Sequence, residues 1–141
     1  MQNSAPIFHL ALPITDIEAA REFYGKVLGL KEKRSAFNWI DFDFWGHQLS
    51  LHLVKEKYQK NESTMIDGDQ VPALHYGLIL DKDVWTKLKD DLSSKKVKFI
   101  IGPKTRFEGK EEEQGTFFIV DPFGNFIEIK CFKNQSNNGW V

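Results

Sequence analysis

Hydrophobic and polar side chains alternate along several short stretches of this chain, a pattern typical of β-strands that bury one face. In the first half, the alternation predicts strands at residues 7–13, about 31–36, about 38–44 and about 47–54. In the second half, it predicts strands at residues 73–80, 97–102, 115–120 and 126–130. Apolar residues at helical spacing predict one helix between residues 15 and 29 and another over residues 81–96.

The predicted elements repeat in the same order in the two halves. FHLAL at residues 8–12 and LHYGL at residues 74–78 occupy the same place in each half. Between the halves, KEKYQKNESTMIDGDQVP shows no period and is interpreted as a long polar connection. We therefore expect a single domain, residues 1–141, divided into one module at about 6–54, a connection at 55–72, a second module at about 73–132 and a tail at 133–141.

Composition narrows the classes of partner. The formal net charge is −1 and the lysines and arginines are scattered, so no basic stripe indicates nucleic acid. No apolar stretch is long enough to cross a bilayer, and the N-terminal residues do not resemble a signal peptide. The single cysteine excludes an internal disulfide and favours a reducing compartment, the cytoplasm. We expect a small-molecule substrate, and neither a nucleic acid nor a membrane partner.

The two faces of the predicted strands differ in chemistry. One set of faces is almost purely apolar, as expected beneath two amphipathic helices. The opposite set collects three of the four histidines and one acidic residue: His9, His52, His75 and Glu128. Ala11 follows His9 and Gly77 follows His75 two positions later on the same face, which we interpret as open volume beside each imidazole.

A carboxylate on a central strand needs an explanation, because burying it without a partner costs several kcal/mol or forces it to take up a proton. A divalent cation shared with His9 and His75 would neutralise Glu128 and use both imidazoles. The structural alternative is that the three side chains are unrelated and hydrogen-bonded separately. His52 is either a fourth ligand or a group that moves protons near a bound substrate, and we favour the second role.

Two imidazoles and one carboxylate, with other positions left open, are typical of non-haem Fe(II) enzymes that use oxygen. The ligand types therefore favour Fe(II) as the cofactor. Mn, Ni, Co and Zn fit the same residues, and their spacing in the sequence does not choose among these metals.

Two motifs carry a resemblance to a known family: DI-x-A-A-R-x-F-Y-x-x-x-L-G-L at residues 16–30 and DP-x-G-N-x-IE-x-K at residues 121–130. With HQLSLHLV and LHYGLIL between them, the chain resembles the vicinal oxygen chelate superfamily over about residues 6–132. This superfamily includes glyoxalase I, extradiol ring-cleaving dioxygenases and bleomycin-resistance proteins, and the chain looks most like predicted extradiol-type dioxygenases.

The resemblance implies an α+β fold of two βαβββ modules that form a curved mixed sheet around a metal-binding cleft, with the helices on the outer face. It implies metal ligands from the first, fifth and last strands, which match His9, His75 and Glu128 here. The acid–base histidine of extradiol enzymes corresponds to His52. In this superfamily a site forms within one chain or between two, so we also consider a homodimer.

We expect a metal-dependent, extradiol-like dioxygenase that acts on a small catecholic or similar oxygen-bearing substrate. The alternatives are a glyoxalase-like lyase or isomerase, and a non-catalytic protein that sequesters an antibiotic-type small molecule. Arg106 falls in a predicted charged loop, residues 104–114, where it could clamp a substrate carboxylate. Phe118 and Trp39 are candidate walls of the substrate pocket, although core packing explains both as well.

Overall fold

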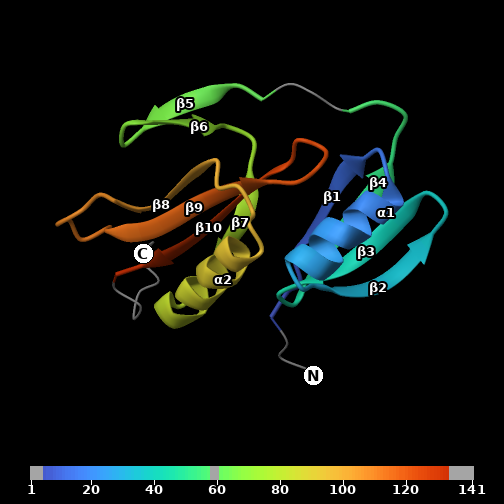
Figure 1. Cartoon of the computed structure of the whole chain (residues 1–141), viewed down its shortest axis with the longest axis horizontal. Helices are drawn as coiled ribbons and strands as arrows, with labels where there is room; N and C mark the ends of the chain where they lie inside the picture. Colours follow the sequence, from blue (N-terminus) through green and yellow to red (C-terminus); the bar gives the residue numbers. More distant parts are fainter. Residues whose placement is uncertain (1–4, 58–60, 134–141) are drawn as a thin grey trace. The chain divides into compact units, whose positions relative to one another are not determined.

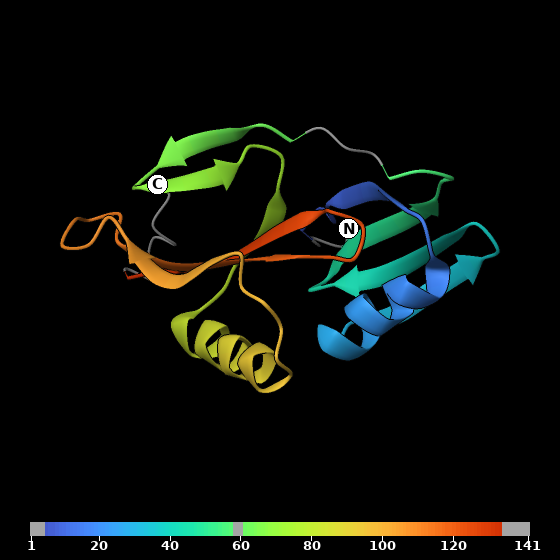
Figure 2. The same ribbon diagram turned by 45° about the horizontal axis from the view of Figure 1, so that its top comes forward.

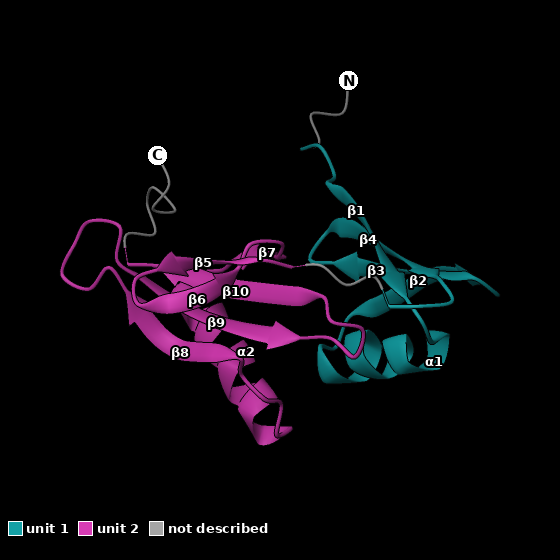
Figure 3. Cartoon of the chain, turned by 90° about the horizontal axis from the view of Figure 1, so that it is seen from above, with its two compact units in different colours: residues 1–58 teal, residues 59–141 magenta. Residues whose placement is uncertain are grey.

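The computed structural model describes residues 5–57 and 61–133 (Figure 1). The chain divides into two compact units, unit 1 at residues 1–58 and unit 2 at residues 59–141 (Figure 3). The boundary between the units falls inside the connection predicted at residues 55–72.

Unit 1 is one βαβββ module. Strand β1 is followed by a short helix, α1, and by a π-helical segment, η1, that continues it directly. The elements are β1 (His9–Ile14), α1 (Ile17–Ala20), η1 (Arg21–Val27), β2 (Lys31–Ala36), β3 (Trp39–Phe44) and β4 (His47–Leu53). The strands form one mixed sheet in the order β1-β4-β3-β2, in which only β1 and β4 are parallel.

The helical segment covers one face of this sheet. The Asp16 side chain accepts a hydrogen bond from the Ala19 N–H at 3.0 Å and so caps the first turn of α1. Tyr24 is fully buried, and its ring lies 5.7 Å from that of Phe42 on the sheet. The buried residues of β3 and β4 on this side include Ile40, Phe42, Leu49 and Leu51. The predicted apolar face is therefore confirmed in unit 1.

Unit 2 contains the second βαβββ module. Its elements are β7 (Tyr76–Ile79), α2 (Lys82–Ser94), β8 (Ile101–Arg106), β9 (Gln114–Val120) and β10 (Phe126–Phe132). The strand order is β7-β10-β9-β8, with β7 and β10 parallel, which is the topology of unit 1. The α+β class and the two repeated modules are confirmed. Among the described residues, each module has its own four-stranded sheet.

The predicted polar connection contains a β-hairpin that sequence analysis missed. Strands β5 (Ser63–Ile66) and β6 (Asp69–Pro72) pair antiparallel across Asp67 and Gly68. Both turn residues have positive φ, 45° and 86°, and Asp-Gly favours such two-residue hairpin turns. Figure 2 shows that the hairpin lies over one face of the unit 2 sheet and α2 over the opposite face.

Strand β8 also differs from its prediction. The strand was expected at residues 97–102 and a charged loop at 104–114, but β8 runs over Ile101–Arg106 and pairs with β9. Lys104 and Arg106 reach Asp69 of the hairpin, with closest N–O distances of 2.7 and 3.1 Å. The hairpin therefore supplies the partner that lets a charged segment continue as a strand. Among the described residues, neither helix is long and apolar enough to cross a membrane.

Candidate functional site

A histidine and a carboxylate meet on the face of the unit 2 sheet opposite α2. Nε2 of His75, just before β7, lies 3.3 Å from Oε1 of Glu128 in β10. The Glu128 side chain is 13% exposed and that of His75 is 27% exposed, so both are largely withdrawn from water while open on one side. The structure thus brings together two of the three predicted metal ligands.

The contact of Nδ1, the second ring nitrogen of His75, determines whether Nε2, which faces the carboxylate, carries a proton. Nδ1 lies 2.7 Å from the carbonyl oxygen of Pro72. Because a carbonyl oxygen only accepts hydrogen bonds, Nδ1 carries the proton. A neutral His75 therefore presents the lone pair of Nε2 to the anionic Glu128. That contact is favourable only when a proton or another cation occupies the space at Nε2.

The electrostatics of the pair agree with this geometry. The Glu128 carboxylate raises the pKa of His75, against the opposing effect of burial. Burial is the largest single influence on Glu128 and acts to raise its pKa. The hydrogen bonds with His75 and Thr116 and the nearby charge of Lys130 together outweigh it, so the pKa of Glu128 lies below its ordinary value. The site therefore favours an anionic Glu128 next to a positive charge.

Two further residues of β9 hold the pair in place. The hydroxyl of Thr116, which is fully buried, donates to Oε2 of Glu128 at 2.7 Å, leaving Oε1 directed at His75. Phe118 is fully buried, and its ring meets the His75 ring edge-on at 5.0 Å. Sequence analysis missed Thr116, although its position on the Glu128 face could have been read from the alternation of β9. Phe118, predicted as a pocket wall, supports the His75 ring.

The small residue after His75 has a different role from the one predicted. A Cβ atom at Gly77 would lie 1.6 Å from the carbonyl oxygen of Glu128. Gly77 therefore allows β7 to pack directly against the β10 backbone, where no side chain fits. The interpretation of Gly77 as open volume for a ligand was wrong. Its physical effect is to bring His75 and Glu128 within reach of each other.

In unit 1, the strand register confirms that His9 and His75 hold equivalent places. Ala11 of β1 is paired with Ser50 of β4, as Gly77 of β7 is paired with Glu128 of β10. Both histidines lie two residues earlier on the same face. His9 is exposed and neighbours Gln48 in the sheet. Position 50, the counterpart of Glu128, therefore carries a hydroxyl in place of a carboxylate.

Unit 1 has its own buried carboxylate, one strand away. Asp41 of β3 accepts hydrogen bonds from the Ser50 hydroxyl at 2.6 Å and from Nε2 of Gln48 at 3.2 Å. A terminal nitrogen of Arg34 lies 3.5 Å from the same carboxylate. Asp41 is only 4% exposed, so these three donors compensate most of its charge. Sequence analysis missed this network, which depends on the register between β2, β3 and β4.

His52 lies four residues beyond Gln48 on β4, beside Trp39 of β3. At strand rise this separates it from the neighbour of His9 by about 13 Å. Trp39 is half-buried, and the Arg34 guanidinium lies 5.8 Å from its ring centroid. His52 and Trp39 are on the same sheet face as His9.

Arg106 is a buried strand residue and does not belong to a charged loop. It is 3% exposed, and Nη1 donates to the carbonyl of Ile66 at 2.9 Å and contacts Asp69. Among the described residues, its Nη2 atom has no hydrogen-bond partner. In this structure Arg106 fastens the hairpin to the sheet. Within residues 5–57 and 61–133, no group of three or more His, Cys, Asp or Glu side chains is gathered as a metal site.

One known protein family matches most of the chain. A family model described as "Glyoxalase/Bleomycin resistance protein/Dioxygenase superfamily" matches residues 7–129. The chain belongs to this superfamily. The match covers both modules and includes His9, His52, His75 and Glu128. The superfamily takes its name from two kinds of enzyme and from resistance proteins, so membership leaves the reaction of this member to be argued from its residues.

Solved structures show the same superfamily fold over nearly the whole chain. A glyoxalase/bleomycin resistance protein/dioxygenase from Alicyclobacillus acidocaldarius is 31% identical, with a TM-score of 0.80, over 96% of this chain and 98% of that one. A glyoxalase/dioxygenase from Nostoc punctiforme is 24% identical, with a TM-score of 0.67, over 94% of each chain. A genomically encoded fosfomycin resistance protein from Listeria monocytogenes is 12% identical, with a TM-score of 0.67, over 96% and 98%. No curated protein matches the chain.

Proposed function

We propose that this superfamily member is a metal-dependent enzyme whose cation is held by His75 and Glu128 together with His9. One observation carries the proposal: Nε2 of His75, left unprotonated by the Pro72 contact, faces the Glu128 carboxylate at 3.3 Å. A divalent cation satisfies both groups at once. His9 is the third ligand because it occupies, in the repeat, the place of His75.

The separation of the two atoms suits a shared metal. Bonds of about 2.0–2.2 Å, at angles between octahedral and tetrahedral, place two ligand atoms about 2.8–3.6 Å apart. The observed 3.3 Å lies within this interval. Thr116 and Pro72 would supply the outer contacts that usually orient a ligating carboxylate and imidazole, since they bond Oε2 of Glu128 and Nδ1 of His75 and leave Oε1 and Nε2 facing each other.

The reaction proposed first is an extradiol-like oxidation of a small catecholic or similar oxygen-bearing substrate, with Fe(II) as the cation. Two imidazoles and a carboxylate leave open positions at which Fe(II) would supply Lewis-acid and redox chemistry when bound. His52 would accept or return a substrate proton, because a neutral imidazole has one nitrogen that accepts a proton and one that donates. Trp39, beside His52, would supply an aromatic wall.

A glyoxalase-like lyase or isomerase is the second candidate, and Gln48 favours it. The Gln48 amide donates through Nε2 to Asp41, which directs its oxygen away from that carboxylate, and Gln48 is paired with His9 in the sheet. An amide oxygen beside His9 would complete a four-ligand site suited to Ni or Zn. Activity on a hemithioacetal with one of these metals would support this reaction over ring cleavage.

Elemental analysis of anaerobically purified protein tests the proposal. We expect roughly one divalent metal ion per chain in the wild type and a loss of most of it in His75→Ala. His52→Ala is the matched control, because it removes an imidazole that is not a proposed ligand and should keep the metal. Equal metal content in wild type and His75→Ala would contradict the site.

Activity measurements then distinguish the proposed dioxygenase from a protein that only sequesters a small molecule. Oxygen uptake on catechols by the iron-loaded wild type, lost in His52→Ala while its iron is retained, would support the dioxygenase. A protein that binds small molecules equally well after its metal is stripped, and turns none of them over, would be a sequestering protein. That result would overturn both enzyme proposals.

A further inference from the structure

His75 is held by different contacts from those that hold His9. His9 is part of β1 and is paired with Gln48 in the unit 1 sheet. The pairing of β7 with β10 begins at Tyr76, one residue after His75. The strand ladder of unit 2 therefore stops short of His75, so the segment before β7 determines how this residue enters the site.

The segment before His75 is joined to the base of the β5–β6 hairpin. The last residue pair of the hairpin is Ser63 with Pro72. Beyond this pair, the Ala73 N–H donates to the carbonyl of Glu62 at 2.7 Å, which continues the antiparallel pairing by one residue. Main-chain hydrogen bonds of the hairpin therefore reach to within two positions of His75.

The side chain of Asn61 supplies the next step of this pairing. Its Nδ2 donates to the carbonyl of Leu74 at 2.6 Å, and its Oδ1 accepts from the Leu74 N–H at 2.8 Å. One amide thus bonds both main-chain groups of the residue next to His75, as a neighbouring strand would. Because these two groups belong to the peptide planes on either side of Leu74, the contact restricts both planes at once.

The same end of the hairpin contacts the imidazole itself. The carbonyl oxygen of Pro72, the last residue of β6, lies 2.7 Å from Nδ1 of His75. Pro72 is buried, whereas Ala73 and Leu74, which connect it to His75, are exposed. Packing therefore holds Pro72, but the two connecting residues depend on their hydrogen bonds, of which Asn61 makes two.

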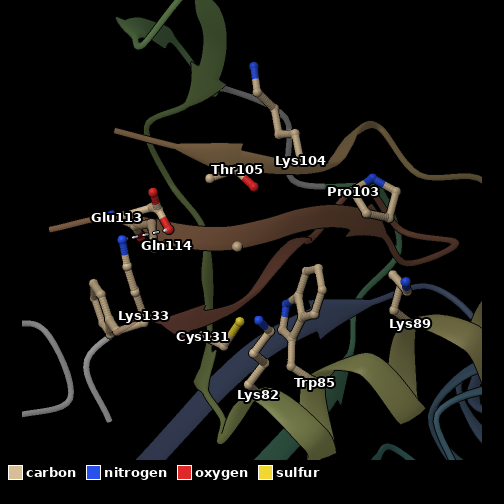
Figure 4. A pocket seen from close by; sticks show the side chains of 12 residues that line it. Lys82, Trp85, Lys89, Pro103, Lys104, Thr105, Glu113, Gln114, Cys131 and Lys133 are labelled. Carbon is tan, nitrogen blue, oxygen red and sulfur yellow. Dashed lines mark ion pairs between the residues drawn. The ribbon is translucent and has the colours of Figure 1, made fainter. Parts of the chain in front are cut away.

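The opposite end of the hairpin is fastened separately. Asp69 forms ion pairs with Lys104 and Arg106 of β8. In Figure 4 the Lys104 side chain is directed away from Trp85, toward the hairpin. This attachment does not involve Asn61. A change at Asn61 should therefore loosen the base of the hairpin and leave its other end on the sheet.

We propose that Asn61 is a positioning residue of the candidate metal site, because it fixes the segment that joins the Pro72 carbonyl to His75. While this segment is held, Nδ1 donates its proton to Pro72 and Nε2 faces Glu128 unprotonated. Without the Asn61 amide, the exposed segment samples other conformations, the Nδ1–H contact opens, and the proton can occupy Nε2 instead. This inference rests on the proposed function, in which Nε2 binds the cation.

Nitrogen-15 NMR of the His75 ring in the metal-free protein tests the inference, with Asn61→Ala and Ser94→Ala as matched variants. Ser94 is exposed in the same unit and donates to the carbonyl of Asp91 at 2.7 Å, so each variant removes side-chain contacts with the main chain. At a pH where His75 is neutral, the wild type and Ser94→Ala should carry the proton on Nδ1. Asn61→Ala should show a mixture of the two neutral tautomers.

Chelator competition with Zn(II) measures the consequence for the cation. Asn61→Ala should bind Zn(II) about three- to tenfold more weakly than the wild type, at or below the low end of the roughly 10- to 100-fold loss typical of a direct outer contact. Ser94→Ala should match the wild type. A tautomer or a Zn(II) affinity that is unchanged in Asn61→Ala, or changed equally in Ser94→Ala, would overturn the inference.

Failure of the proposed function gives a different result. A wild type that binds no Zn(II) would contradict the proposed function. The tautomers of the metal-free proteins would then still decide whether Asn61 positions His75, because that measurement needs no metal.

Discussion

Each unit joins a carboxylate to a hydroxyl across two neighbouring strands, but the strands are exchanged and the registers differ. Asp41 is paired with Ser50 in the sheet, whereas Glu128 is paired with Phe118 and Thr116 with Lys130. In unit 1 the carboxylate is Asp41 on β3, and Ser50 on β4 donates to it at 2.6 Å. In unit 2 the carboxylate is Glu128 on β10, the counterpart of β4, and Thr116 on β9 donates to it at 2.7 Å. Because the strands are exchanged, the two carboxylates have different neighbours: Asp41 lies near Gln48 and Arg34, and Glu128 lies near His75.

Asp41 has three hydrogen-bond donors around its carboxylate, whereas Oε1 of Glu128 faces a nitrogen that carries no proton when His75 is neutral. The Asp41 carboxylate is within reach of Gln48 and Arg34 as well as Ser50. Glu128 has one hydroxyl donor and an imidazole whose facing nitrogen is unprotonated when the ring is neutral. A carboxylate that already has its hydrogen bonds stabilises a fold, and one that lacks a cation is suited to bind one. The comparison predicts opposite consequences for equivalent substitutions.

The largest expected effect is that of Glu128→Gln. The amide keeps the size of the side chain but removes the charge that attracts the cation, so metal affinity should fall by more than about 100-fold, beyond the usual effect of an outer contact. Competition with a chelator measures this affinity. Asp41→Asn is the matched change in unit 1, and a comparable loss of metal in that variant would contradict the distinction between the two carboxylates.

Asp41→Asn should instead lower stability. Its amide nitrogen cannot accept the hydrogen bonds that Ser50 and Gln48 now donate, and one of these donors is left unsatisfied in a buried position. We expect a loss of about 1–3 kcal/mol in the free energy of unfolding, measured by urea denaturation with metal removed. A stability equal to that of the wild type would show that the network is not needed for folding.

Much of this comparison could be predicted from the sequence, because alternation depends on local residue types. The face that collects His9, His75 and Glu128 follows from a period of two, and the repeat of FHLAL and LHYGL indicated the equivalent registers. Gly77 shows the limit of such reasoning. A small residue was interpreted as open space, although its cause is the approach of the β10 backbone, which comes from a distant part of the chain.

The hairpin and β8 were missed for a related reason. Asp67 and Gly68 are a local turn signal, but the flanking strands have only four residues each and β5 is exposed throughout, so their apolar periodicity is weak. Arg106 was assigned to a loop because its neighbours are charged. Its burial depends on Ile66 and Asp69, forty and thirty-seven positions earlier, and no pattern in the local sequence specifies those contacts.

Thr116→Val should have a smaller effect than Glu128→Gln. It removes the hydroxyl that orients Oε2 of Glu128 while keeping the shape of the side chain. Loss of an outer contact typically weakens metal binding by about 10- to 100-fold, and we expect the lower end because His75 keeps its Pro72 contact. Ser50→Ala, the same deletion in unit 1, should leave the chelator titration unchanged. An effect of Ser50→Ala as large as that of Thr116→Val would contradict the comparison.

The smallest expected effect is on the pH dependence of the metal-free protein. The raised pKa of His75 contributes stability that is present below its ordinary value of 6.5 and is lost as pH rises through the shifted value. The lowered pKa of Glu128 contributes stability that is present above its ordinary value of 4.5 and is lost as pH falls through the shifted value. The pair therefore stabilises most between these two values.

Urea unfolding of the metal-free wild type and Glu128→Gln across this range measures the contribution. The difference between the two proteins should be largest between pH 4.5 and 6.5, the ordinary pKa values of the two groups, and should shrink on either side. In Glu128→Gln the imidazole resonance of His75 should titrate at lower pH than in the wild type. A titration of His75 that is unchanged in this variant would mean that the two side chains do not interact in solution.

The most direct test of the shared cation is to count the imidazoles bound to it. Pulsed electron paramagnetic resonance of the Mn(II)-loaded protein resolves the coordinated nitrogens of histidine. We predict two imidazoles in the wild type, one in His9→Ala, one in His75→Ala and two in His52→Ala. A wild-type spectrum with one imidazole or none, or a His9→Ala spectrum identical to it, would contradict the proposal that His9, His75 and Glu128 hold one ion.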